Sequence, residues 1–102
     1  MTYPTHNQND TTTIRLHGRF IFESHKDFRL AADQGLAHHG TRTLILDMEE
    51  VEYLDSAALG MLLLLKEKAE AAGKTIQIKT PQGIAQKVLE VANFHKLFTI
   101  LT

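Results

Sequence analysis

The chain has 102 residues, no cysteine and a formal net charge of −1, and 43% of its residues are apolar. This length and apolar fraction fit a single domain with one core and argue against disorder outside the termini. Without cysteine, the chain has no disulfide, thiolate metal ligand or thiol chemistry. Its lysines and arginines are scattered rather than clustered, which argues against direct nucleic-acid binding.

The first ten residues, 1–10, are polar and lack the apolar core of a signal peptide. They predict either a frayed edge strand around Tyr3 to Gln8 or no regular structure. The apolar run Leu62 to Leu65 is far too short to span a bilayer. We therefore expect no membrane insertion and a cytoplasmic location.

Apolar and polar residues alternate over Thr11 to His17, which predicts a half-buried strand that ends at Gly18. Ser24 stands at the position of a helix N-cap, and Asp27 completes a capping box. The helix that follows is expected to end near Ala37.

Paired histidines, His38 and His39, follow this helix. Adjacent residues at a helix end point in different directions, and no third ligand stands at metal-ligand spacing. Histidines near a helix C-terminus also complement the helix dipole. We therefore predict no metal site.

The central stretch of the chain is an apolar strand over Thr43 to Met48, a short acidic turn, and a long helix that begins at Asp55-Ser56. The continuous apolar run within the strand predicts a central position with both faces covered. Asp55 is a good N-cap, and Ser56 lies on the first helical turn, beside unpaired N–H groups and the positive end of the helix dipole. Gly73 marks the end of this helix.

The last third predicts a strand over Lys74 to Lys79, a helix that begins with Thr80 as N-cap and Pro81 as its first residue, a short helical turn, and a final strand over Thr99 to Leu101. The apolar face of that helix is expected to comprise Ile84, Val88, Leu89 and Val91. Five residues across the chain are expected in the core: Ala32, Leu44, Leu46, Ile76 and Val88. Alternating strands and helices predict an α/β fold whose mixed, mainly parallel sheet has four to five strands, with helices packed on it.

A helical projection divides the long helix into two faces around Ser56. The face away from Ser56 is expected to pack on the sheet, and its members are Ala58, Met61, Leu62, Leu65, Ala69 and Ala72. Leu59, Gly60 and Leu63 lie on the Ser56 side together with charged residues. They form a partner surface, or another helix of the domain covers them, or the leucines are scattered exposed residues of the kind that is common on protein surfaces.

The string Asp55-Ser56-Ala57-Ala58-Leu59-Gly60 resembles the Asp-Ser-(Ser/Thr)-Gly-Leu-Gly signature of anti-sigma-factor antagonists, which are small STAS-domain proteins. Ala57 and Ala58 depart from the signature, but the hydroxyl that the resemblance marks for phosphorylation, on Ser56, is present. The resemblance implies one STAS domain over residues 1–102. It also implies that the segment Arg19 to Phe22 carries part of the binding surface, although Ile21 stands where relatives often have an acidic residue.

By this resemblance, the unphosphorylated protein binds an anti-sigma factor that is often itself a serine kinase, phosphorylation of Ser56 blocks binding, and a serine phosphatase restores it. The residues expected at the partner surface are Phe20, Phe22, Asp55, Ser56, Ala57, Leu59, Gly60 and Leu63.

Two other functions are open at this point. One is a STAS regulatory subunit of a membrane transport complex. The other is a small enzyme or nucleotide-binding protein, which we do not expect because no Gly-rich phosphate loop and no base near Ser56 in the sequence are present. We therefore expect no catalytic residue and no cofactor.

Overall fold

The computed structural model describes residues 3–101 of the chain, which form five strands and three α-helices with two short 3-10 turns. In chain order the elements are β1 (Thr5–Gln8), β2 (Thr11–Phe20), the 3-10 turn η1 (Phe22–Ser24), α1 (His25–Ala37), β3 (Thr43–Leu54), α2 (Ser56–Ala71), β4 (Thr75–Lys79), α3 (Gly83–Val91), the 3-10 turn η2 (Phe94–Lys96) and β5 (Thr99–Leu101).

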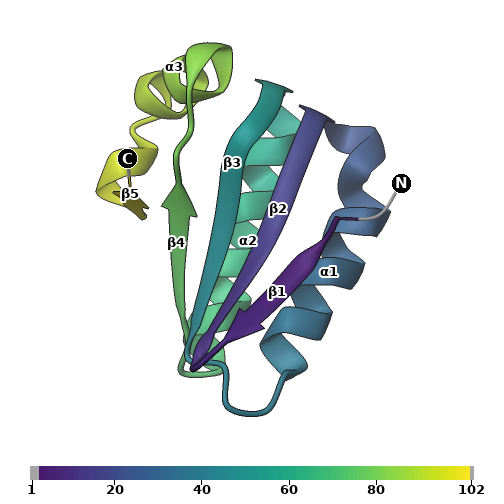
Figure 1. Cartoon of the computed structure of the whole chain (residues 1–102). Coiled ribbons are helices and arrows are strands. Elements are labelled where there is room, and N and C mark those ends of the chain that lie inside the picture. Colours follow the sequence, from purple (N-terminus) through teal and green to yellow (C-terminus); the bar gives the residue numbers. More distant parts are fainter. Residues whose placement is uncertain (1–2, 102) are drawn as a thin grey trace.

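The five strands form one sheet in the order β1-β2-β3-β4-β5, so that each strand lies beside its predecessor in the chain (Figure 1). The β1–β2 pair is antiparallel, whereas β2–β3, β3–β4 and β4–β5 are parallel. The predicted α/β class and the mixed, mainly parallel sheet are therefore confirmed. Of the two alternatives for the N-terminal segment, the edge strand is the one observed.

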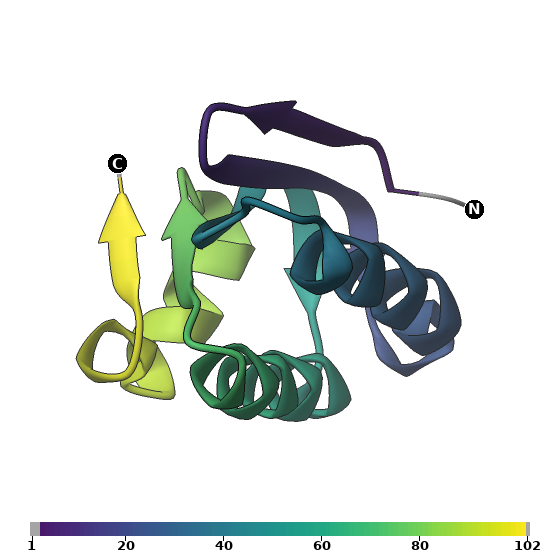
Figure 2. The ribbon, with the colours of Figure 1, turned by 90° about the horizontal axis from the view of Figure 1, so that it is seen from below.

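Helices α1 and α2 cover the same face of the sheet, as the view along the strands shows (Figure 2). Crossovers between parallel strands are nearly always right-handed. Because the β2–α1–β3 and β3–α2–β4 crossovers step in the same direction across the sheet, the common hand places both helices on one side.

The opposite face of the sheet is not covered by α1 or α2 (Figure 2) and is largely polar, although Asp47 on it is only 7% exposed. It carries Arg15 and Asp47, whose side chains lie 3.9 Å apart, and the half-buried Ile45. The expectation that both faces of the central strand are covered was therefore wrong. An apolar run of three residues does not reveal which of its side chains faces solvent.

Strands β2 and β3 both extend further than their apolar patterns predict. Gly18 has a φ of +68°, but β2 continues through it to Phe20, and the expected acidic turn after Met48 is instead the second half of β3. Two register shifts, each adding a residue to β3, let the two strands remain paired up to Phe20 and Leu54. Such bulges tolerate a left-handed glycine and polar residues within a strand.

The predicted C-terminal ends of the helices agree with the structure better than the predicted N-terminal starts do. Gly73, with a φ of +74°, ends α2 in a Schellman motif: its N–H donates to the carbonyl of Glu70, and the N–H of Lys74 donates to that of Ala69. The Ser24 hydroxyl does not cap α1. It accepts from the N–H of Ile21 and donates to the carbonyl of Arg19, and so stabilises the 3-10 turn in front of the helix.

The predicted start of α3 was also wrong. Thr80 has a φ of +51° and donates its N–H to the carbonyl of Leu101, which joins it to the C-terminal strand rather than to the helix. Helix α3 begins three residues later, at Gly83.

The core lies between the sheet and the helices. Four of the five residues predicted for it are buried: Ala32, Leu44, Leu46 and Ile76. Val88 is only half-buried, at the edge of the core. Helix α3 directs Ala85 and Leu89 inward, packs the half-buried Val88 against the core and exposes Ile84 and Val91. The predicted apolar face of this helix is therefore correct at Leu89 and in part at Val88.

Candidate functional site

The junction of β3 and α2 places Ser56 at the first position of a well-capped helix. Asp55 has extended backbone angles, and its Oδ1 accepts the N–H of Ala58 at 2.8 Å, as an N-cap side chain does. Ser56 is exposed, and no hydrogen bond within residues 3–101 holds its hydroxyl. The hydroxyl is therefore accessible to a modifying enzyme and lies where a helix start stabilises added negative charge.

The second carboxylate oxygen of Asp55 reaches a different part of the chain. Its Oδ2 accepts the backbone N–H of Phe22 at 3.1 Å, across 33 positions of sequence. The Phe22 ring stacks on His25 with ring centroids 5.0 Å apart, and the Nδ1 of His25 donates to the Phe22 carbonyl at 2.9 Å. One carboxylate thus caps α2 and also holds the turn in front of α1 beside Ser56.

Helix α2 has the two faces that the projection predicts, with one exception on each. Ala58, Leu62, Leu65 and Ala69 are buried, and Met61 is half-buried against them. Ala72 is exposed because the helix ends before it. On the other face Gly60 and Leu63 are exposed, whereas Leu59 is half-buried against the core.

The residues expected at the partner surface do not all reach it. Phe20 is 0% exposed and packs against Phe28 in the core, with ring centroids 4.9 Å apart, so its assignment to the partner surface was wrong. The reason is the continuation of β2 past Gly18, which pairs Phe20 with Leu54 instead of placing it in a loop. Phe22 is 58% exposed and is the aromatic residue of this segment that a partner can contact.

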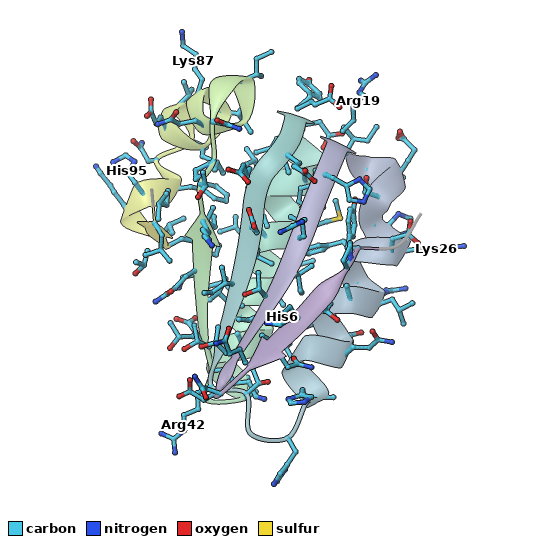
Figure 3. The ribbon with its side chains drawn as sticks, viewed as in Figure 1. His6, Arg19, Lys26, Arg42, Lys87 and His95 are labelled. Carbon is cyan, nitrogen blue, oxygen red and sulfur yellow. The ribbon has the colours of Figure 1, made fainter. Side chains whose placement is uncertain are left out.

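Exposed groups that were not predicted from the sequence lie on the two elements that meet at Ser56, namely β3 and α2. Leu64 is 60% exposed, and Tyr53 is exposed at the end of β3. The guanidinium of Arg19 lies 5.5 Å from the centre of the Tyr53 ring, at the end of the sheet where β2 and β3 terminate (Figure 3). A run of four leucines was a signal for Leu64, because the buried face of α2 has room for only two of them, Leu62 and Leu65.

We name one set of residues around and along the first turns of α2 the Ser56 surface: the exposed Phe22, Tyr53, Ser56, Gly60, Leu63 and Leu64, together with the half-buried Asp55. It combines apolar side chains with the hydroxyls of Ser56 and Tyr53 and the carboxylate of Asp55. Within residues 3–101, no three histidine, aspartate or glutamate side chains gather as metal ligands would. The surface is thus suited to contact with another molecule through apolar groups.

Comparison with known sequences assigns the family. A protein-family model with the description "Mlab, STAS domain" matches residues 5–102. A STAS-domain containing protein of Pseudomonas aeruginosa is 39% identical over 88 residues, which cover 86% of this chain and 85% of that protein. The chain therefore belongs to the STAS-domain family.

Solved structures of anti-sigma factor antagonists have the same fold. An anti-sigma factor antagonist from Mycobacterium paratuberculosis superposes with a TM-score of 0.85 at 16% identity, covering 98% of this chain and 84% of that one. The unphosphorylated anti-sigma factor antagonist SpoIIAA gives 0.80 at 19% identity, covering 99% and 89%.

Two further solved structures also share the fold. The phosphorylated form of SpoIIAA from Bacillus gives a TM-score of 0.72 at 19% identity and covers 99% of this chain and 92% of that one. A sulfate transporter family protein from Wolinella succinogenes gives 0.76 at 17% identity, covering 90% and 76%. The fold is therefore shared by anti-sigma factor antagonists and by a sulfate transporter family protein.

The described part of the chain, residues 3–101, holds no helix that is both long and apolar enough to cross a membrane.

Proposed function

We propose that the protein is an anti-sigma-factor antagonist of a partner-switching module. Its unphosphorylated form binds an anti-sigma factor that is also a serine kinase, phosphorylation of Ser56 blocks this contact, and a serine phosphatase reverses the block. The protein acts in the cytoplasm as a binding module rather than as a catalyst. The observation that carries the proposal is the exposed Ser56 hydroxyl at the start of α2, next to the Asp55 that binds exposed Phe22, with exposed Leu63 and Leu64 two turns further along the helix.

The environment of Ser56 explains how a phosphate can act without unfolding the domain. Phosphorylation adds about −1.5 to −2 charges and three acceptor oxygens beside Asp55. The free N–H groups at the α2 start and the helix dipole offset this charge, so the helix remains stable. A partner that buries the same surface must remove water from the phosphate, and this cost falls on binding alone.

The structures of SpoIIAA support the proposal by analogy. SpoIIAA, a protein of the same fold, is known in unphosphorylated and phosphorylated forms and is named an anti-sigma factor antagonist. The alternative is a STAS regulatory subunit of a membrane transport complex, which the fold of the sulfate transporter family protein keeps open. In that case Ser56 would contact a transporter component and would not be phosphorylated.

The decisive test compares three forms of the protein: Ser56→Ala, Ser56→Asp and protein with phosphoserine incorporated at position 56. Partners captured from lysate on the unmodified protein are identified and purified, and their affinities for each form are measured by calorimetry. We expect Ser56→Ala to bind like the unmodified protein and the phosphorylated form to bind at least about tenfold more weakly, because desolvating a charged group costs more than 1.4 kcal/mol.

A matched control is phosphoserine at Asp10, which is exposed in the turn between β1 and β2, at the opposite end of β2 and β3 from Ser56. It adds phosphate charge at a distance from the α2 start and should leave binding nearly unchanged. Equal binding by the Ser56→Ala and Ser56-phosphorylated forms would reject the switch. Capture of a transporter component in place of an anti-sigma factor would favour the alternative function.

A further inference from the structure

A hollow of about 160 Å³ lies between α1 and α2, next to the Ser56 surface. Its floor is apolar and consists of Phe28, Ala32, Met61 and Leu65. A cavity of about 150 Å³ lined by such side chains accommodates a benzene-sized group. The hollow is therefore the right size for one large apolar side chain of another molecule.

Leu64 forms the lip of this hollow and is the most exposed leucine of α2. Leu64 contributes little to the stability of the domain at this position, because most of its side chain remains in water. An inserted apolar group would cover both Leu64 and the floor. Apolar anchors in pockets of this kind supply much of the affinity of protein interfaces.

The rim of the hollow carries more positive than negative charge. Arg29 lies on α1 one turn after His25, and Lys68 faces them from α2. The Lys68 Nζ lies 3.6 Å from Asp33, but both side chains are about half exposed and the pair is correspondingly weak. Arg29 forms no ion pair within residues 3–101. A ligand with negative charge beside its apolar anchor would complement this rim.

The hollow is continuous with the Ser56 surface. Ser56, Gly60 and Leu64 are exposed at successive i, i+4 positions and form one row along α2. On the α1 side, His25 borders the hollow and stacks on Phe22, whose N–H is bound by Asp55. A molecule seated on Ser56 and Phe22 can thus reach the hollow without a gap.

We propose that this α1–α2 hollow is a second contact for the partner and receives an amphipathic helix that carries one large apolar anchor with acidic residues one turn away. This inference rests on the proposed function, because it extends the contact around Ser56. Helices commonly bind in this way, with an apolar face in a groove and charges at its edge. The cationic rim then selects an acidic segment and rejects a basic one.

The first experiment probes the hollow without any natural partner. Isotope-labelled protein is titrated with a designed helical peptide of about 15 residues that has one phenylalanine anchor and a glutamate one turn before and after it. Two matched peptides replace the anchor by alanine or the glutamates by lysines. We expect amide shifts at Arg29, Leu64 and Lys68 with the glutamate peptide, and responses about tenfold weaker with either control peptide.

Two variants with matched controls test the same contacts from the protein side. Leu64→Ala should lower the affinity for the glutamate peptide about tenfold. Ile84→Ala should leave that affinity unchanged, because Ile84 lies on α3 at nearly the same exposure as Leu64 (59% against 60%). Arg29→Glu should lower the affinity for the glutamate peptide and raise the affinity for the lysine peptide. Arg42→Glu, at an exposed residue at the lower end of the sheet (Figure 3), should change neither.

Equal responses to the glutamate and lysine peptides, or no shifts at the hollow, would overturn the inference. So would a titration in which dodecanoate shifts the hollow while no peptide does, because the site would then take a fatty acid rather than a protein segment.

Binding measurements with the purified partner distinguish a failure of this inference from a failure of the proposed function. If phosphorylation at Ser56 weakens its binding but Leu64→Ala and Arg29→Glu do not, the second contact is wrong and the switch stands. If the two substitutions weaken binding but phosphorylation does not, the second contact stands and the switch is wrong.

Discussion

The two faces of α2 differ in what holds their side chains. On the inner face Leu62 and Leu65 are buried against the sheet, whereas on the outer face Leu63 and Leu64 are 38% and 60% exposed. Neighbouring leucines of one helix therefore have different roles. The inner face supplies the stability of the domain, and the outer face, with Ser56 at its start, is available to a partner. Substitutions should separate the two functions.

The largest effect is expected from Leu62→Ala. Leu62 is fully buried, so its truncation removes apolar contacts and leaves a cavity, at a cost of about 2–5 kcal/mol in the free energy of unfolding. Urea denaturation measures this cost. Binding of the folded fraction should be unchanged, and an unaltered unfolding midpoint would contradict the inner-face assignment.

An intermediate effect is expected from Asp55→Ala, which acts on the boundary between the two faces. Loss of the cap to Ala58 should cost about 1 kcal/mol of stability, and loss of the bond to the Phe22 N–H should increase hydrogen exchange at that amide. Asp55→Asn is the control, because asparagine has one acceptor oxygen and caps helices as well as aspartate does. It should retain the stability while the Phe22 amide exchanges faster. Unchanged Phe22 exchange in both variants would show that the link is not formed in solution.

A small effect on stability, of no more than about 0.5 kcal/mol, is expected from Leu63→Ala, because this leucine is exposed. Its affinity for the purified partner should nevertheless fall, since apolar contact is lost. Calorimetry and thermal melts of the same preparation measure both quantities. A large loss of stability with intact binding would assign Leu63 to the core.

The smallest effect is expected from Ser56→Ala. The cap at Asp55 is retained, and the serine hydroxyl has no hydrogen bond to lose within the described residues, so stability should change by only a few tenths of a kcal/mol. Thermal melts check this. A marked loss would mean that the hydroxyl has a structural role and would weaken the case for a regulatory one.

Those features of the site that depend on local sequence were predictable. The Asp55 cap, the position of Ser56 and the end of α2 at Gly73 all follow from residues within a few positions of one another. The two faces of α2 followed from helical periodicity, except where Leu59 and Ala72 depend on neighbouring elements and on where the helix stops.

Features that depend on distant residues were not predictable in the same way. Phe20 looked like a loop residue because glycine precedes it by two positions, but bulges in β3 keep β2 paired beyond Gly18. The bond between Asp55 and Phe22 joins two segments that no local pattern connects. The hollow beside Leu64 exists only because α1 packs beside α2.

The strand order has a consequence for how the chain folds. Each strand pairs with the one before it, so every addition to the sheet closes a loop no longer than one helix and its connections. Loop closure of this kind has a modest entropic cost, and folding can proceed by adding neighbours instead of waiting for distant segments to meet. The short outer strands β1 and β5 each have only one neighbour. We therefore expect their amides to exchange first in native-state hydrogen exchange. The amides of β2, β3 and β4 should exchange last, and Asp55 and α2 lie in the connection between β3 and β4.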